Sequence, residues 1–223
     1  MNNSKNNDSI DRIRAGIFDV DGTLLDSMSV WDDIGERYLL SQGITAGSDI
    51  NSALSTMSME QGAAYLKEKY HLDKPEPQIV KEVLKIVEDF YRFEALLKPG
   101  VKETLEWFNR KDIRMVVATS GNRELAEAAL KRNGVLEYFE KIYTCTEVGA
   151  GKDEPVIYLK AAERFGMDLE NIIVVEDAVH AAETAKKAGF TVLGVYDESS
   201  RDNSSEMKDI CDFYYERMDQ IIQ

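Results

Sequence analysis

Two aspartates at the end of a short apolar run form the segment of this chain most suited to chemistry. Asp19 and Asp21 stand two residues apart and are followed at once by Gly22 and Thr23. On a strand, side chains two positions apart point to the same side. Carboxylates that close repel each other unless a cation or a shared proton relieves them. A solvated Asp-x-Asp-Gly turn is the alternative interpretation, and this segment alone does not separate the two.

Further polar residues follow later apolar runs of the chain. Thr119 and Ser120 follow one run, Glu176 and Asp177 end another, and Lys152 follows the run between them. If these runs are parallel strands of one sheet, their carboxyl ends lie along one edge, where open α/β sheets bind ligands. The sequence therefore predicts that these side chains converge with the paired aspartates.

The predicted set of side chains suits phosphoryl transfer. Asp19, Asp21 and Asp177 offer the hard oxygen ligands that Mg²⁺ prefers. Lys152, the Thr119 hydroxyl and backbone amides at helix starts can hold a phosphoryl group. Phosphoryl transfer requires positioned charge, a metal and a nucleophile. One acid can act as nucleophile and form an aspartyl phosphate, and a second can act as general acid and base.

The hydrophobic pattern predicts an α/β fold in which a Rossmann-like parallel sheet forms a core with an inserted α-helical cap. Near-continuous Val and Ile runs between helical segments are typical of a parallel sheet covered on both faces. The expected strands are residues 14–20, 113–119, 141–145, 171–175, 191–196 and 213–215. Helical periodicity fills the region between the first strand and the rest. We expect a core domain of residues 1–27 and 98–223 and a helical cap domain of residues 28–97.

The composition of the chain limits the classes of partner that it is expected to bind. It has 27 basic and 41 acidic residues, a net charge of −14 that disfavours nucleic acid and anionic membranes. No apolar run approaches the ~20 residues that span a bilayer, and the polar residues 1–8 are typical of a disordered lead-in rather than a signal peptide. Two distant cysteines imply no disulfide framework. We expect a cytoplasmic monomer or weak homodimer that acts on a small phosphorylated metabolite.

Four segments together resemble the motifs of the haloacid dehalogenase-like (HAD) superfamily. Residues 19–27, Asp-Val-Asp-Gly-Thr-Leu-Leu-Asp-Ser, are similar to its first motif, DxDGTLxDS. The other three motifs are matched in the family's order at Thr119, at Lys152, and at Glu176-Asp177 with Ala185, Ala188 and Gly189. The helical insertion after the first motif resembles the type-1 cap of the phosphoglycolate phosphatase and beta-phosphoglucomutase branch.

The resemblance implies a role for each acid. Asp19 is expected to be the nucleophile and a metal ligand. Asp21 is expected to be the general acid and base, with its backbone carbonyl on Mg²⁺. Asp177 is expected to ligate the same metal, and Glu176 to ligate it or to support the ligands.

The resemblance also implies how a phosphoryl group is held. Thr119 and the amide of Ser120 are expected to bind it, and Lys152 to neutralise both it and the nucleophile. The family's third motif often reads Lys-Pro-x-Pro-Asp, whereas residues 152–156 read Lys-Asp-Glu-Pro-Val. Two acids beside the lysine weaken the local attraction for anions and leave the reacting groups in place.

These observations favour a Mg²⁺-dependent phosphatase, a HAD-like phosphoric monoester hydrolase that works through an aspartyl phosphate. A sugar phosphomutase of the beta-phosphoglucomutase type is the alternative. That branch usually carries a cap arginine for a second phosphate, and residues 53–60 contain no Arg or Lys. A dehalogenase is disfavoured because those relatives lack the second acid, which is present here as Asp21. No single cap lysine stands out as the Schiff-base residue of a phosphonatase, and a non-catalytic phosphate-binding module would be expected only if a reacting group were missing.

Overall fold

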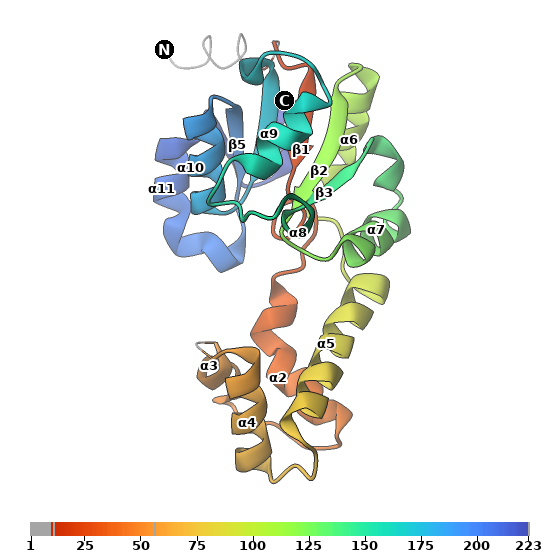
Figure 1. Cartoon of the computed structure of the whole chain (residues 1–223), viewed down its shortest axis with the longest axis vertical. Helices are drawn as coiled ribbons and strands as arrows, with labels where there is room; N and C mark the ends of the chain where they lie inside the picture. The colour runs from red at the N-terminus through yellow and green to blue at the C-terminus, as the bar shows by residue number, and fades with distance from the viewer. Residues whose placement is uncertain (1–9, 11, 56, 223) are drawn as a thin grey trace. The chain divides into compact units, whose positions relative to one another are not determined.

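The computed structural model describes residues 10, 12–55 and 57–222. A six-stranded parallel sheet forms the middle layer of one of its two compact units (Figure 1). The strands are β1 (Ala15–Phe18), β2 (Arg114–Thr119), β3 (Ile142–Thr144), β4 (Ile172–Glu176), β5 (Thr191–Val195) and β6 (Phe213–Tyr215). Their order is β3-β2-β1-β4-β5-β6, and every neighbouring pair is parallel. Ile17 of β1 pairs with Val116 of β2 and Val174 of β4, so the first strand lies in the middle. The predicted α/β class is confirmed.

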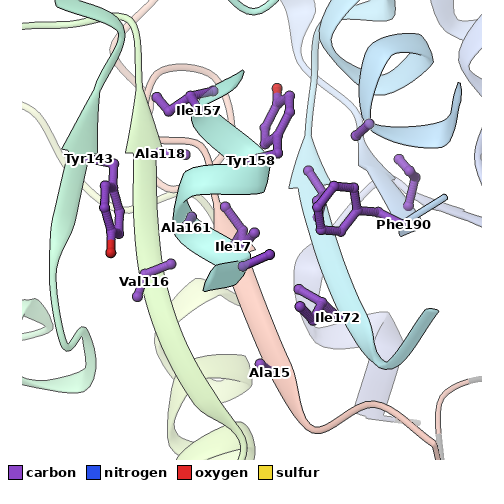
Figure 2. Packing of buried hydrophobic residues seen from close by; sticks show 14 of the residues in the cluster. Ala15, Ile17, Val116, Ala118, Tyr143, Ile157, Tyr158, Ala161, Ile172 and Phe190 are labelled. Carbon is purple, nitrogen blue, oxygen red and sulfur yellow. The ribbon is translucent and has the colours of Figure 1, made fainter. Parts of the chain in front are cut away.

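Strand β1 is buried on both faces, which explains its uninterrupted apolar sequence. Ile17 belongs to a core cluster that also contains residues of α9 (Val156–Glu163) and α10 (Val179–Ala188) (Figure 2). Phe18, the next residue, points to the opposite face, where its ring centroid lies 5.8 Å from that of Phe108. Phe108 belongs to α6 (Val101–Arg110). Helices therefore cover both faces of the sheet.

Side-chain caps set the limits of the elements near the predicted phosphate-binding segments. The Asn122 side chain accepts a hydrogen bond from the Leu125 amide at 3.2 Å and begins α7 (Arg123–Arg132). Thr144 and Glu147 form a capping box that begins the short helix α8 (Cys145–Val148). Strand β3 consequently ends at Thr144 and is shorter than the expected 141–145. A further short helix, α11 (Ser204–Ile210), precedes β6.

Residues Met28–Glu94 form a second compact unit made of helices. These are α2 (Ser29–Ser41), α3 (Ile50–Leu54), α4 (Met59–Tyr70) and α5 (Glu76–Phe93). Tyr38, Leu39, Ile50, Leu66 and Ile79 are among the residues of its separate hydrophobic core. The described part of this unit contains no strand, and Thr56 and the lead-in at residues 1–8 lie outside the described residues.

The second boundary of the helical unit falls after Glu94, whereas the sequence interpretation set it after residue 97. The residues between these positions pair with the segment that follows β1. The Asp26 amide donates to the Leu96 carbonyl at 2.9 Å, and the Lys98 amide donates to the Leu24 carbonyl at 3.0 Å. This pairing ties residues 96–98 to the unit that contains the sheet. Across the described chain, every helix is too short or too polar to cross a membrane.

Candidate active site

The paired aspartates lie in the loop just after β1. The strand ends at Phe18, so Asp19 follows it, although the sequence interpretation placed Asp19 within a strand over residues 14–20. Asp21 lies two residues further along the same loop. The Asp19 amide still donates to the Val175 carbonyl at 3.0 Å, which keeps Asp19 against β4. Asp19 is buried, and Asp21 is half-buried.

The turn at Gly22 brings the loop after β1 against the end of β4. Gly22 has a φ of +81°, a conformation that side chains rarely adopt, and a Cβ there would overlap the Asp177 carboxylate. The Thr23 hydroxyl donates to Asp177 Oδ1 at 3.1 Å, and both residues are buried. Glycine at this position therefore allows Asp177 to approach the first motif.

Three buried carboxylates form a potential metal site. Among the described residues, Asp19, Glu176 and Asp177 offer oxygens that all lie within 4.8 Å of one another. Burial, reinforced by the charge of Asp19, raises the pKa of both Glu176 and Asp177. Burial of these carboxyls therefore disfavours their ionised forms as long as no further cation offsets the charge. Clustered carboxylate oxygens of this kind fit a hard divalent cation.

Lys152 supplies the positive charge next to this cluster. Its ammonium contacts Asp19 Oδ1 and lies 2.7 Å from Glu176 Oε1. Burial opposes the charged form, but the charges of Asp19 and Glu176 outweigh it and raise the pKa of Lys152. Lys152 lies in the loop between α8 and α9, because α9 begins only at Val156.

The predicted phosphate-binding segment follows β2. The Gly121 amide donates to the Thr119 hydroxyl at 2.9 Å. A Cβ on Gly121 would lie 3.1 Å from Asp21 Oδ2 and 3.2 Å from Thr119 Oγ1, so Asp21 and Thr119 flank this glycine. Ser120 is exposed, and its hydroxyl lies 3.4 Å from the Cys145 sulfur. The structure therefore brings the first and second motifs together.

Asp21 has surroundings unlike those of Asp19. Its Oδ1 accepts a hydrogen bond from the fully buried Ser27 hydroxyl at 2.7 Å. Arg123, the arginine next to the Thr119 segment, donates to the Ile142 carbonyl and pairs with Glu147 at 2.5 Å. The Arg123 guanidinium is thus held by the Ile142 carbonyl and the Glu147 carboxylate.

Two residues of the site carried no signal in the sequence analysis. Tyr158 donates from its hydroxyl to Glu176 Oε1 at 2.7 Å, and burial together with the Glu176 charge raises its pKa, so the hydroxyl keeps its proton. Lys98 donates to the Gly22 carbonyl at 2.5 Å and to Asp197 Oδ2 at 2.7 Å. Tyr158 lay in an apolar helical stretch and Lys98 in a Lys-Pro-Gly loop, and neither context predicts a distant polar partner.

The arrangement places clustered carboxylate oxygens beside a buried lysine, a combination that suits a cation and an anionic group. Its acids and its lysine come from the loop after β1, the end of β4 and the loop after α8, at the carboxyl-end edge of a parallel sheet. An open α/β sheet with a site at this edge is typical of an enzyme that binds a small ligand there.

Comparison with known proteins identifies the family to which this chain belongs. A family profile described as haloacid dehalogenase-like hydrolase matches residues 16–195. The phosphorylated carbohydrates phosphatase of Thermotoga maritima is 31% identical over 180 residues, which cover 80% of this chain and 82% of that protein. The fructose-1-phosphate phosphatase of Escherichia coli is 27% identical over 183 residues, covering 80% of this chain and 94% of that protein.

A solved structure shares the fold over nearly the whole chain. A candidate beta-phosphoglucomutase from Thermotoga maritima superposes with a TM-score of 0.82 and 26% identity, covering 94% of this chain and 97% of that one. The profile match and the 31% identical relative show that the chain belongs to the haloacid dehalogenase-like hydrolase family. The resemblance predicted from the four motifs is confirmed.

Proposed function

We propose that this protein is a Mg²⁺-dependent phosphatase that hydrolyses a small sugar phosphate through an aspartyl phosphate on Asp19. Its class as a phosphoric monoester hydrolase follows from the family match and from relatives named as phosphatases. The two relatives described above act on phosphorylated carbohydrates and on fructose 1-phosphate, which supports a sugar phosphate as substrate. The observation that carries the proposal is the buried contact between Lys152 and Asp19 within an acidic cluster.

The donor set fits the proposed cation. Asp19, Asp177 and the backbone carbonyl of Asp21 would hold Mg²⁺, with Glu176 as a further ligand or a support. Bound Mg²⁺ orients the phosphoryl group and offsets its negative charge. Lys152 and Thr119, with the Ser120 amide, would hold the remaining phosphoryl oxygens.

The chemistry needs two acids with different tasks. A carboxylate oxygen of Asp19 attacks phosphorus, the bond from phosphorus to the ester oxygen breaks, and Asp21 donates its proton to that oxygen. Asp21 then removes a proton from water as the water attacks the aspartyl phosphate. The bond between phosphorus and Asp19 breaks, inorganic phosphate leaves, and both aspartates regain their starting states.

A panel of phosphorylated metabolites tests the proposal, with sugar and hexitol phosphates beside p-nitrophenyl phosphate. We expect phosphate release that stops when the metal is chelated and returns with Mg²⁺. Asp19→Asn should lower turnover by about 10³-fold or more, because it removes the nucleophile. Turnover that persists in chelator, or full activity of Asp19→Asn, would contradict the mechanism.

A phosphomutase is the second candidate, because the structural relative described above is a candidate beta-phosphoglucomutase. The absence of Arg and Lys from residues 53–60 argues against it, since a bisphosphate intermediate would lack a counter-charge there. Incubation of β-glucose 1-phosphate with its bisphosphate activator separates the two. Glucose 6-phosphate as the main product identifies a mutase, and free glucose identifies a phosphatase.

A further inference from the structure

We propose that Tyr158 is a positioning residue, whose hydroxyl holds Glu176 so that the Lys152 ammonium stays on Asp19. The inference rests on the proposed function, in which Lys152 neutralises the nucleophile. It adds a residue that lies outside the four motifs and that does not itself touch the reacting atoms.

One carboxylate oxygen receives two donors at this site. The Tyr158 hydroxyl and the Lys152 ammonium each lie 2.7 Å from Glu176 Oε1. Tyr158 is fully buried, and only 1% of Glu176 is exposed, so bulk water does not compete for these bonds. The same ammonium also contacts Asp19, and Lys152 is therefore shared between two carboxylates.

The hydroxyl of Tyr158 affects how Lys152 is shared. A buried carboxylate requires hydrogen-bond donors, and it attracts a nearby cation more strongly when it has fewer of them. Removal of the Tyr158 hydroxyl takes one of the two donors from Glu176 Oε1. Lys152 should then move toward Glu176 and away from Asp19. The nucleophile would lose part of the positive charge that neutralises it and the incoming phosphoryl group.

The ring of Tyr158 is held in place independently of its hydroxyl. It packs against Phe190 with a centroid distance of 6.3 Å and an edge-on geometry, within the core cluster shared by α9 and the sheet. Tyr158→Phe keeps this ring and removes a single oxygen. Tyr143 of β3 provides a matched control, because it is a buried tyrosine of the same cluster whose hydroxyl points in the opposite direction (Figure 2).

The test compares Tyr158→Phe with Tyr143→Phe by steady-state kinetics on p-nitrophenyl phosphate, by crystal structures and by melting temperature. We expect Tyr158→Phe to lower kcat about tenfold while KM changes less than about twofold, the size of effect that loss of a hydrogen bond to a charged group produces. Its crystal structure should show Lys152 beyond about 3.5 Å from Asp19. Tyr143→Phe should keep both the wild-type kcat and the Lys152 position.

Each outcome of this comparison decides the proposal. Equal kcat in the two variants, or a Tyr158→Phe structure with Lys152 still on Asp19, would overturn it. A lower melting temperature of Tyr158→Phe with unchanged kcat would assign the hydroxyl a purely structural role and overturn it as well. If the wild-type protein hydrolyses no phosphate ester, the proposed function fails, and the two crystal structures still decide whether Tyr158 positions Lys152.

Discussion

At the scale of single residues, the two aspartates after β1 differ in their partners. Asp19 is buried, contacts the Lys152 ammonium and belongs to a cluster of carboxylates. Asp21 accepts a hydrogen bond from the neutral Ser27 hydroxyl at 2.7 Å. The two aspartates are therefore held by different parts of the site, Asp19 by the lysine and Asp21 by a hydroxyl of its own loop.

Asp21→Asn tests the proton-transfer role. p-Nitrophenolate leaves without needing a proton, but an alkoxide needs one, and hydrolysis of the aspartyl phosphate needs a base. We predict that Asp21→Asn still releases one p-nitrophenolate per enzyme in a rapid burst and then stalls. With an alkyl phosphate the burst should slow by about 10²–10⁴-fold. Stopped-flow absorbance and rapid quench measure the two bursts, and equal slowing for both substrates would rule out Asp21 as general acid.

At the scale of elements, the turn after β1 determines how closely Asp177 approaches. Gly22 and Gly134 both have positive φ values, +81° and +68°. A Cβ on Gly134 would meet nothing within 4 Å, whereas one on Gly22 would overlap the Asp177 carboxylate. An alanine at either position would therefore meet a similar backbone strain, and the two positions differ in the contact that its side chain would make.

This difference gives a matched pair of variants. We predict that Gly134→Ala lowers the free energy of unfolding by about 1 kcal/mol, the cost of the left-handed conformation. Gly22→Ala should cost more. It should also abolish the rise in melting temperature that we expect Mg²⁺ to give the wild-type protein, because Asp177 would be displaced. Urea unfolding and thermal scans with and without Mg²⁺ measure both effects. An identical Mg²⁺ response in the two variants would show that the turn does not position a metal ligand.

The elements that the sequence predicts well are those with a simple burial pattern. Strands β1, β2 and β4 are buried on both faces, so continuous apolar runs mark them, and the shared chain direction places their polar ends on one edge. Helix α3 has only five residues, too few to show a helical period. The end of β3 depends on a capping box at Thr144, which the apolar pattern of the strand does not reveal.

The partners of single polar side chains were harder to predict. Tyr158 and Lys98 reach Glu176 and Gly22 across long stretches of sequence. Such contacts depend on tertiary packing, which neither periodicity nor spacing encodes. The candidate site residues could be named from the sequence because several of them follow or end strands, whereas Tyr158 and Lys98 come from a helix and a loop.

At the scale of the whole molecule, the chain divides into two units with separate hydrophobic cores. Leu66 is 3% exposed within the helical unit, and Val174 is fully buried in the sheet. We predict that Leu66→Ala destabilises its own unit by about 2–5 kcal/mol. Hydrogen exchange followed by mass spectrometry should show faster exchange in residues 28–94 and little change in the sheet.

Val174→Ala is the reciprocal control, with faster exchange expected in the strands of the sheet. Uniformly faster exchange throughout the chain after Leu66→Ala would mean that the two cores unfold as one cooperative unit.

In the proposed mechanism, Asp19 carries the phosphoryl group as an aspartyl phosphate. The most direct measurement mixes the enzyme with Mg²⁺ and a ³²P-labelled substrate, quenches with acid within milliseconds and maps the label by peptide digestion. We predict label on the peptide that contains Asp19 in the wild-type protein and none in Asp19→Asn. Label on another residue, or hydrolysis without any covalent label, would rule out Asp19 as the nucleophile.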